Sequence, residues 1–165
     1  MMNNKENITS DIEPVKVAIY DVPQISDEMW NRLTEQNKID LLKKQIVTNT
    51  LIKAGARISD KGFYLSRDII LLYAEKECPV DVKFRKIGSI VAQKYKMCFT
   101  TMVYSVNRMI NKAMSLADID FIENYFGTCY SSYTATVTPR AFLLRIVDDV
   151  KMQYEVLEKG GVINE

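Results

Sequence analysis

Residues 84–116 read FRKIGSIVAQKYKMCFTTMVYSVNRMINKAMSL, and this stretch decides the fold that we expect. Apolar residues recur at helical spacing on both sides of the short segment Lys96-Met97-Cys98-Phe99. The pattern predicts one helix from about Phe84 to Tyr95 and another from Thr100 to Leu116. Two helices joined by a turn of about four residues are the outline of a helix-turn-helix, although this turn lacks the glycine often found there.

The second of these helices has two unlike sides. At about 100° per residue, its apolar side holds Met102, Val106, Met109, Ala113 and Leu116. The other side is polar and carries no acidic residue. Arginine pairs bidentately with guanine, asparagine pairs with adenine, and threonine or tyrosine reaches phosphates or a thymine methyl. The candidate base-reading residues are Thr100, Thr101, Tyr104, Asn107, Arg108 and Asn111. A core helix with a neutral outer side remains the alternative.

The basic residues are unevenly distributed along the chain. From Val82 to Ala117 there are seven basic residues and no Asp or Glu, whereas the other 129 residues hold 15 basic and 21 acidic residues. The net charge of +1 hides this asymmetry. A one-sided distribution indicates a surface that faces a polyanion, with ordinary solvated lysines as the alternative. The candidate DNA-phosphate contacts are Lys83, Arg85, Lys86, Lys94, Lys96 and Lys112.

The remaining chain from Asn37 onward is also helical in its pattern. Asn37 is expected to cap a helix that Gly55 ends, with Ile39, Leu42, Ile46, Thr50 and Leu51 as its apolar side. After a loop over residues 59–62, another helix is expected from about Tyr64 to Glu77. Asp118 caps a short helix that ends at Phe126-Gly127. After a Thr/Ser/Tyr-rich loop, Thr138-Pro139 opens the last helix, to about Glu158, with Phe142, Leu143, Ile146, Val150 and Tyr154 in the core.

The first 36 residues differ in character, with seven acidic and three basic residues. Val15, Val17 and Ile19 alternate as in a short strand, and Ser26 is expected to cap a short helix that carries Trp30. The expected organisation is an acidic N-terminal extension over residues 1–36, a helical domain over 37–159 and a tail over 160–165. The fold class is all-α, a six-helix bundle with a helix-turn-helix in a winged-helix-like arrangement, whose extension holds one strand.

Composition argues against an enzyme, a metal site and a cofactor site. The chain has no histidine, which removes the commonest general base and metal ligand. Cys78, Cys98 and Cys129 are odd in number and far apart, so we expect reduced, buried thiols and no zinc site. Asp118 and Asp120 are expected at a helix start, and the pair Asp148-Asp149 on a solvated or subunit-facing surface.

No apolar run reaches the roughly 18 residues that a membrane span needs, and the first residues lack the apolar core of a signal peptide. We therefore expect a cytoplasmic protein without membrane contact.

About three-quarters of the chain, residues 38–158, resembles a known family. The shared segments, in the same order and spacing, are Ala54-Gly55, Lys61-Gly62-Phe63-Tyr64-Leu65, Arg67-Asp68-Ile69-Ile70, Ile90-Val91-Ala92-Gln93-Lys94-Tyr95, Ala113-Met114, Asp118-Ile119-Asp120, Tyr125-Phe126-Gly127, Thr138-Pro139 and Phe142. They are similar to the DNA-binding effector domain of the sporulation stage 0 protein A family, the sporulation response regulators of endospore-forming Firmicutes. The resemblance implies a bacterial, nucleoid-associated protein with six helices, of which the third and fourth form the helix-turn-helix.

The chain departs from this family in two respects. Full-length members begin with a phosphoacceptor receiver domain, whereas the 36-residue acidic extension precedes the match here, so we expect no direct control by aspartyl phosphorylation. Where the family's recognition helix carries a serine, several arginines, a glutamate and a histidine, this chain has Thr100, Thr101, Val103, Tyr104, Asn107 and Arg108. The family's late loop carries lysines, and here it has Thr134 and Thr136. The family's scaffold is expected to be kept here, whereas its DNA site is not implied for this chain.

Two functions of different classes follow. The first is a stand-alone DNA-binding protein that inserts the helix 100–116 in the major groove, as a transcriptional regulator or as an architectural accessory factor, for example for a recombinase of a mobile element. The second is a protein-interaction module, or an antagonist, that kept the fold and lost DNA binding. The expected partners are double-stranded DNA, a second copy bound through the last helix or the N-terminal extension, and a protein partner. The extension is expected to shield the basic surface or to recruit that partner.

Overall fold

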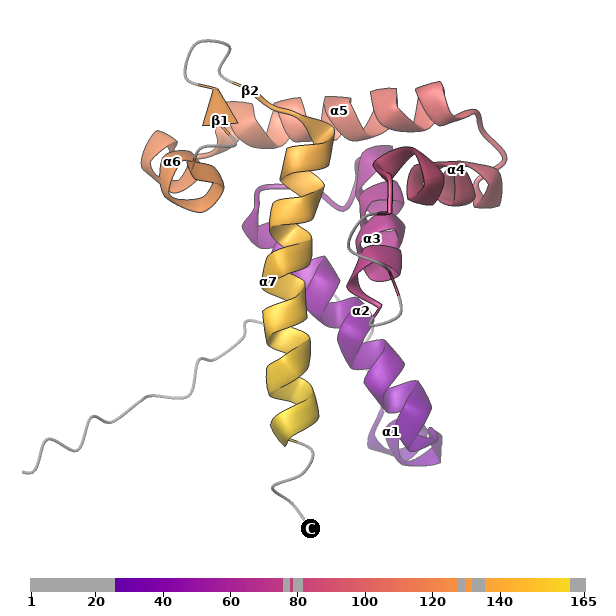
Figure 1. The fold of residues 1–165 in the computed structure, drawn as a ribbon. Helices are drawn as coiled ribbons and strands as arrows, with labels where there is room; N and C mark the ends of the chain where they lie inside the picture. The colour runs from indigo at the N-terminus through magenta and orange to yellow at the C-terminus, as the bar shows by residue number, and fades with distance from the viewer. Residues whose placement is uncertain (1–25, 76–77, 79–81, 128–129, 132–135, 161–165) are drawn as a thin grey trace, which may run out of the picture.

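A computed structural model describes residues 26–75, 78, 82–127, 130–131 and 136–160. Within these residues the chain forms seven helices and one short pair of strands (Figure 1). The elements are α1 Asp27–Arg32, α2 Glu35–Lys53, α3 Lys61–Ala74, α4 Phe84–Lys94, α5 Phe99–Leu116, α6 Ile119–Phe126, β1 Tyr130–Ser131, β2 Thr136–Val137 and α7 Pro139–Gly160. The all-α prediction is confirmed. The strand expected over residues 15–19 and the tail from residue 161 lie outside the described residues.

The helices form a bundle in which α5 lies across one end of α3 and α7 (Figure 1). α4 lies against the first half of α5, and α6 with the strand pair lies at its other end. The core is made by the inner sides of these helices, and its largest fully buried side chains include Phe63, Leu65, Ile69, Met102, Met109, Ile110, Phe142, Leu143 and Ile146. One side of α5 therefore belongs to the core, whereas its other side faces away from the bundle.

Three of the predicted helix starts are confirmed by their caps. The Ser26 side chain accepts a hydrogen bond from the Met29 backbone N–H, Asp118 accepts one from Asp120, and Thr138 accepts one from Ala141. The predicted cap Asn37 is wrong. Its own N–H donates to the Thr34 hydroxyl, so α2 begins at Glu35 and the boundary expected after residue 36 falls inside this helix.

The bounds of α3 also differ from the prediction. The helix runs from Lys61 to Ala74 instead of Tyr64 to Glu77, so Lys61 and Gly62 are helical and not part of a loop. Glycine suggested a loop because it weakens isolated helices. Here it is needed for packing, because a Cβ atom on Gly62 would lie 2.4 Å from the Ser105 carbonyl oxygen of α5.

Two residues expected in the core are exposed. Leu116 is 62% exposed because α5 ends there and the chain leaves the bundle to start α6. Ile39 is 36% exposed because α2 buries side chains only in its second half, at Val47, Thr50 and Leu51. The loop expected between α6 and α7 contains the antiparallel pair β1–β2, with Tyr130 opposite Val137. Burial of Val137 against the core accounts for this short pairing.

A solvated surface, one of the two alternatives expected at Asp148-Asp149, is wrong for Asp149. Its carboxylate accepts a hydrogen bond from the Tyr125 hydroxyl at 2.6 Å and one from the Arg145 guanidinium at 3.1 Å. Arg145 also donates to the Tyr125 carbonyl oxygen. Burial, and then the hydrogen bond to Asp149, raise the pKa of Tyr125. These contacts attach α6 to the side of α7.

We expect the free energy of unfolding to fall at alkaline pH. Burial raises the pKa of Tyr154, whose hydroxyl donates to the Lys43 carbonyl oxygen, from 10.0 to about 12. The folded state favours the neutral phenol, so its stabilisation is complete below pH 10 and is lost as the pH rises from about 10 to 12. The loss reaches about 1.4 kcal/mol per pH unit for each such group.

Urea unfolding at pH 9, 10 and 11 measures this loss. Tyr154→Phe should be less stable than wild type at pH 9 and should lose less stability than wild type between pH 9 and 11. An equal loss in both proteins would contradict the assignment to Tyr154.

Candidate nucleic-acid interface

The six candidate base-reading residues lie on the solvent side of α5. Thr100, Thr101, Arg108 and Asn111 are exposed, Tyr104 is 69% exposed, and Asn107 is half-buried. The opposite side buries Met102, Val106, Met109, Ile110, Ala113 and Met114. Helical spacing alone placed these residues together, and the structure brings them to one side of one helix. No acidic residue occurs in α5.

The outer side of α5 is slightly hollowed between Tyr104 and Ser115. A depression of about 420 Å³ is lined by α5 residues only, namely Tyr104, Asn107, Arg108, Asn111, Lys112 and Ser115. Thr100 and Thr101 lie at the start of the helix, outside this depression. The sequence reasoning missed Ser115, although its position four residues after Asn111 places it on the same side of the helix.

The turn between α4 and α5 contains a lysine in the left-handed region. The Lys96 N–H donates to the Gln93 carbonyl and the Met97 N–H to the Ala92 carbonyl, which is the Schellman arrangement of a helix end. Lys96 has φ +53°, and the equivalent residue after α2 is Gly55, with φ +87°. The turn therefore forms without glycine, at a cost of roughly 1–2 kcal/mol for a side chain in this conformation.

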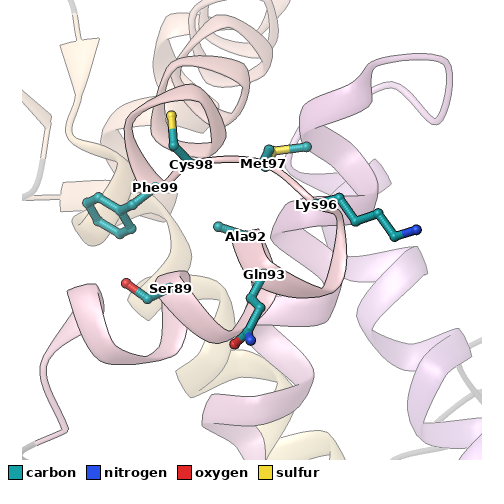
Figure 2. Close-up of a pocket in the computed structure, with 7 residues that line it drawn as sticks. All are labelled: Ser89, Ala92, Gln93, Lys96, Met97, Cys98 and Phe99. Atoms are coloured by element: carbon teal, nitrogen blue, oxygen red, sulfur yellow. The ribbon is translucent and has the colours of Figure 1, made fainter.

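A second hollow of about 380 Å³ lies inside this helix-turn-helix and is lined by Ser89, Ala92, Gln93, Lys96, Met97, Cys98 and Phe99. Figure 2 shows that Ala92 points toward its centre, whereas the Lys96 side chain extends away from it. Ser89 and Gln93 are exposed polar residues on α4 that the sequence reasoning missed.

Cys98 contradicts the expectation of buried thiols. It is exposed at the N-cap of α5, and Cys78 is half-buried. The Cys98 sulfur lies 3.0 Å from the Thr101 hydroxyl. Hydrogen bonding from the Thr101 side chain, followed by that from its backbone N–H, lowers the pKa of the thiol. Cys129 lies outside the described residues.

The six candidate phosphate contacts divide into two groups. Lys83, Arg85, Lys86 and Lys96 are exposed and form no ion pair with any described residue. The Arg85 guanidinium stacks over the Phe99 ring, 5.7 Å from its centre, which ties the start of α4 to the start of α5. Lys94 and Lys112 are paired with Asp68 and Asp60, so their charges are partly neutralised within the protein.

Asp68 is the only charged residue among the buried ones in the described part of the chain. Its carboxylate accepts hydrogen bonds from the Lys94 ammonium at 2.6 Å and from the Tyr95 hydroxyl at 3.0 Å, and Arg67 lies at 3.6 Å. The hydrogen bond to Asp68, and then its negative charge, raise the pKa of Lys94. Asp68 thus joins the middle of α3 to the end of α4, directly before the turn.

Two further findings concern other kinds of site. Among the described residues, no three Cys, Asp or Glu side chains are grouped so that they could hold a metal ion. Within the same part of the chain, every helix is too short or too polar to cross a membrane.

Comparison of the chain with protein-family models, with curated proteins and with solved structures finds no match.

Proposed function

We propose that the protein is a sequence-specific DNA-binding protein that places the outer side of α5 in the major groove. The observation that carries this proposal is the acid-free, hydrogen-bonding side of α5, which lies at the edge of the bundle with nothing described covering it. Next to this side of α5 lie the unpaired basic residues of α4 and of the turn between α4 and α5. Recognition helices of this kind read bases through residues on one side, while neighbouring basic groups contact phosphates.

The order of the helices supports the same function. α4 and α5 are the third and fourth helices of the region that resembles the sporulation stage 0 protein A effector domain, in which these two form the helix-turn-helix. Membership of that family and its winged-helix-like arrangement are part of this proposal. A role as transcriptional regulator or as accessory factor for recombination is compatible with the same surface. If α5 does not read DNA, the protein-interaction module becomes the better hypothesis.

Salt dependence tests the phosphate contacts. If Lys83, Arg85, Lys86 and Lys96 each neutralise one phosphate, log Kd for DNA should rise with log salt concentration with a slope of about 3.6. Fluorescence anisotropy with a labelled duplex between 50 and 300 mM salt measures this slope. An affinity that is unchanged by salt would exclude the proposed interface.

Lys96→Gly separates the role of this lysine in binding from its role in folding. Glycine relieves the left-handed strain at φ +53°, so the free energy of unfolding of the variant should be roughly 1 kcal/mol higher than that of wild type. The loss of one phosphate contact should at the same time lower the salt slope by about 0.9. Weaker binding by a more stable protein cannot result from unfolding. An unchanged slope would show that Lys96 contacts no phosphate.

Arg108→Ala and Asn107→Ala test base reading. Each should cost about 1–3 kcal/mol of binding free energy at the preferred site and little on random DNA, because a bidentate base contact is lost. Arg32→Ala is the matched control, since it removes the same charge from exposed α1 at the far end of α2. If the ratio of specific to random binding stays the same in both α5 variants, α5 is not the reading helix.

A further inference from the structure

The outer side of α4 is basic with an apolar residue in its middle. Lys83, Arg85 and Lys86 lie at its start, where the helix dipole is already positive and acidic residues are normally favoured. Ile90, one turn after Lys86, is 49% exposed. All four residues are exposed, and none of the three basic ones is paired with a described acidic residue, although the Arg85 guanidinium stacks on the Phe99 ring of α5. This basic α4 face, defined by Lys83, Arg85, Lys86 and Ile90, is therefore suited to an acidic segment that also carries apolar side chains.

The chain itself contains such a segment. Residues 1–25 hold the acidic Glu6, Asp11, Glu13 and Asp21 against two lysines, and Val15, Val17 and Ile19 follow Glu13 closely. Opposite charges attract over about 10 Å at moderate salt, and an exposed isoleucine gives apolar residues a point of contact. The segment thus complements the basic α4 face in both charge and polarity.

The length of this segment allows it to reach α4. Its connection to the bundle is Ser26, directly before α1, which lies at the far end of α2 from the α4–α5 unit (Figure 1). The helix α2, of 19 residues, is about 28 Å long. The twenty residues from Glu6 to Ile25 span up to about 66 Å when extended. The acidic residues farthest along the chain from Ser26, and therefore best able to reach α4, are Glu6, Asp11 and Glu13.

We propose that residues 1–25 dock on the basic α4 face of the same chain and compete there with DNA phosphates. This inference rests on the proposed function, because it concerns the regulation of DNA binding. The docked segment neutralises Lys83, Arg85 and Lys86, which make up three of the four unpaired candidate phosphate contacts. DNA must displace the segment before these side chains can bind the backbone, so the segment weakens binding to all DNA and most of all at low salt.

The test uses the full chain with its extension neutralised by Glu6→Gln, Asp11→Asn, Glu13→Gln and Asp21→Asn. The control carries Asp40→Asn, Glu123→Gln, Asp148→Asn and Glu155→Gln, which change the net charge equally at exposed positions of the bundle. At 50 mM salt the extension variant should bind a random duplex roughly ten-fold more tightly than the control, and the two should converge as salt screens the attraction. Equal Kd values for the two variants at low salt would overturn the regulatory role.

A second readout needs no DNA. Backbone amide NMR shifts of the wild type and of the extension variant should differ mainly at residues 83–90, and Ile90→Ser should move the same signals in the same direction. Differences confined to another part of the bundle, or none, would overturn the docking site. Differences that grow with protein concentration would assign the docked segment to a second copy and overturn docking within one chain. If none of the proteins binds DNA, the proposed function fails, while the amide shifts still decide the docking site.

Discussion

Gly62→Ala should destabilise the folded protein by about 3 kcal/mol, at the upper end of what overpacking costs. The added methyl group would lie 2.4 Å from the Ser105 carbonyl oxygen and 2.8 Å from the Met109 Cβ atom. Backbone cannot move aside as a side chain can, so α3 and α5 would have to separate. Alanine favours a helix by about 1 kcal/mol over glycine, and this gain is too small to offset the loss of close packing between α3 and α5. Urea unfolding followed by circular dichroism measures the change.

Gly88→Ala is the matched control on α4. Its Cβ atom would approach the Met102 Cε atom at 2.6 Å and the Phe99 ring at 2.7 Å, both of which are side-chain ends. These groups can adjust, so we expect a change within about 1 kcal/mol once the helix preference of alanine is included. If Gly62→Ala is as mild as Gly88→Ala, the close crossing of α3 and α5 is not the reason for this glycine.

Asp68→Ala should destabilise the protein by about 3 kcal/mol, from a lost hydrogen-bond acceptor and an emptied buried site. Lys94, whose side chain is 66% exposed, returns to water when its partner is lost, so no uncompensated buried charge adds to this cost. The Tyr95 hydroxyl loses its acceptor, and the buried Asp68 site is left as a cavity. Because Asp68 holds the end of α4, DNA binding should weaken together with stability.

Lys94→Ala separates the contribution of the Lys94 ammonium to stability from that of the Asp68 carboxylate. This variant leaves the buried Asp68 carboxylate without its ammonium partner but keeps the hydrogen bond from Tyr95, with Arg67 at 3.6 Å, so we expect a loss of about 2 kcal/mol in the free energy of unfolding. It should also leave the salt slope for DNA nearly unchanged, because Lys94 is engaged by Asp68 and contributes less to phosphate binding. A slope lower by a full 0.9 would show that Lys94 contacts DNA as an unpaired lysine does.

The amino-acid sequence predicts the helices and the two sides of α5 well, because both depend on local spacing. The six candidate base-reading residues of α5 fall on one side of a regular helix whatever that helix packs against. Local rules also predicted the caps at Ser26, Asp118 and Thr138. They failed at Gly62, where the deciding contact comes from Ser105, more than forty residues later in the chain.

The charge state of the candidate interface could not be predicted in the same way. Asp68 precedes Lys94 by 26 residues, and Asp60 precedes Lys112 by 52, so an acid-free window in the sequence did not show that two of its lysines are paired. The left-handed Lys96 is also invisible in the sequence, because a lysine after a helix gives no sign of its backbone conformation. The two ion pairs arise only when the helices pack.

Selection of bound DNA from a random pool, followed by sequencing, tests the central proposal most directly. If α5 reads base edges, the wild-type protein should enrich one sequence motif. Arg108→Ala should lose preference at one or two positions of that motif, and Lys96→Gly should enrich the same motif with weaker binding. A pool that stays random for the wild type, together with an affinity that does not depend on salt, would contradict the account and favour the protein-interaction module.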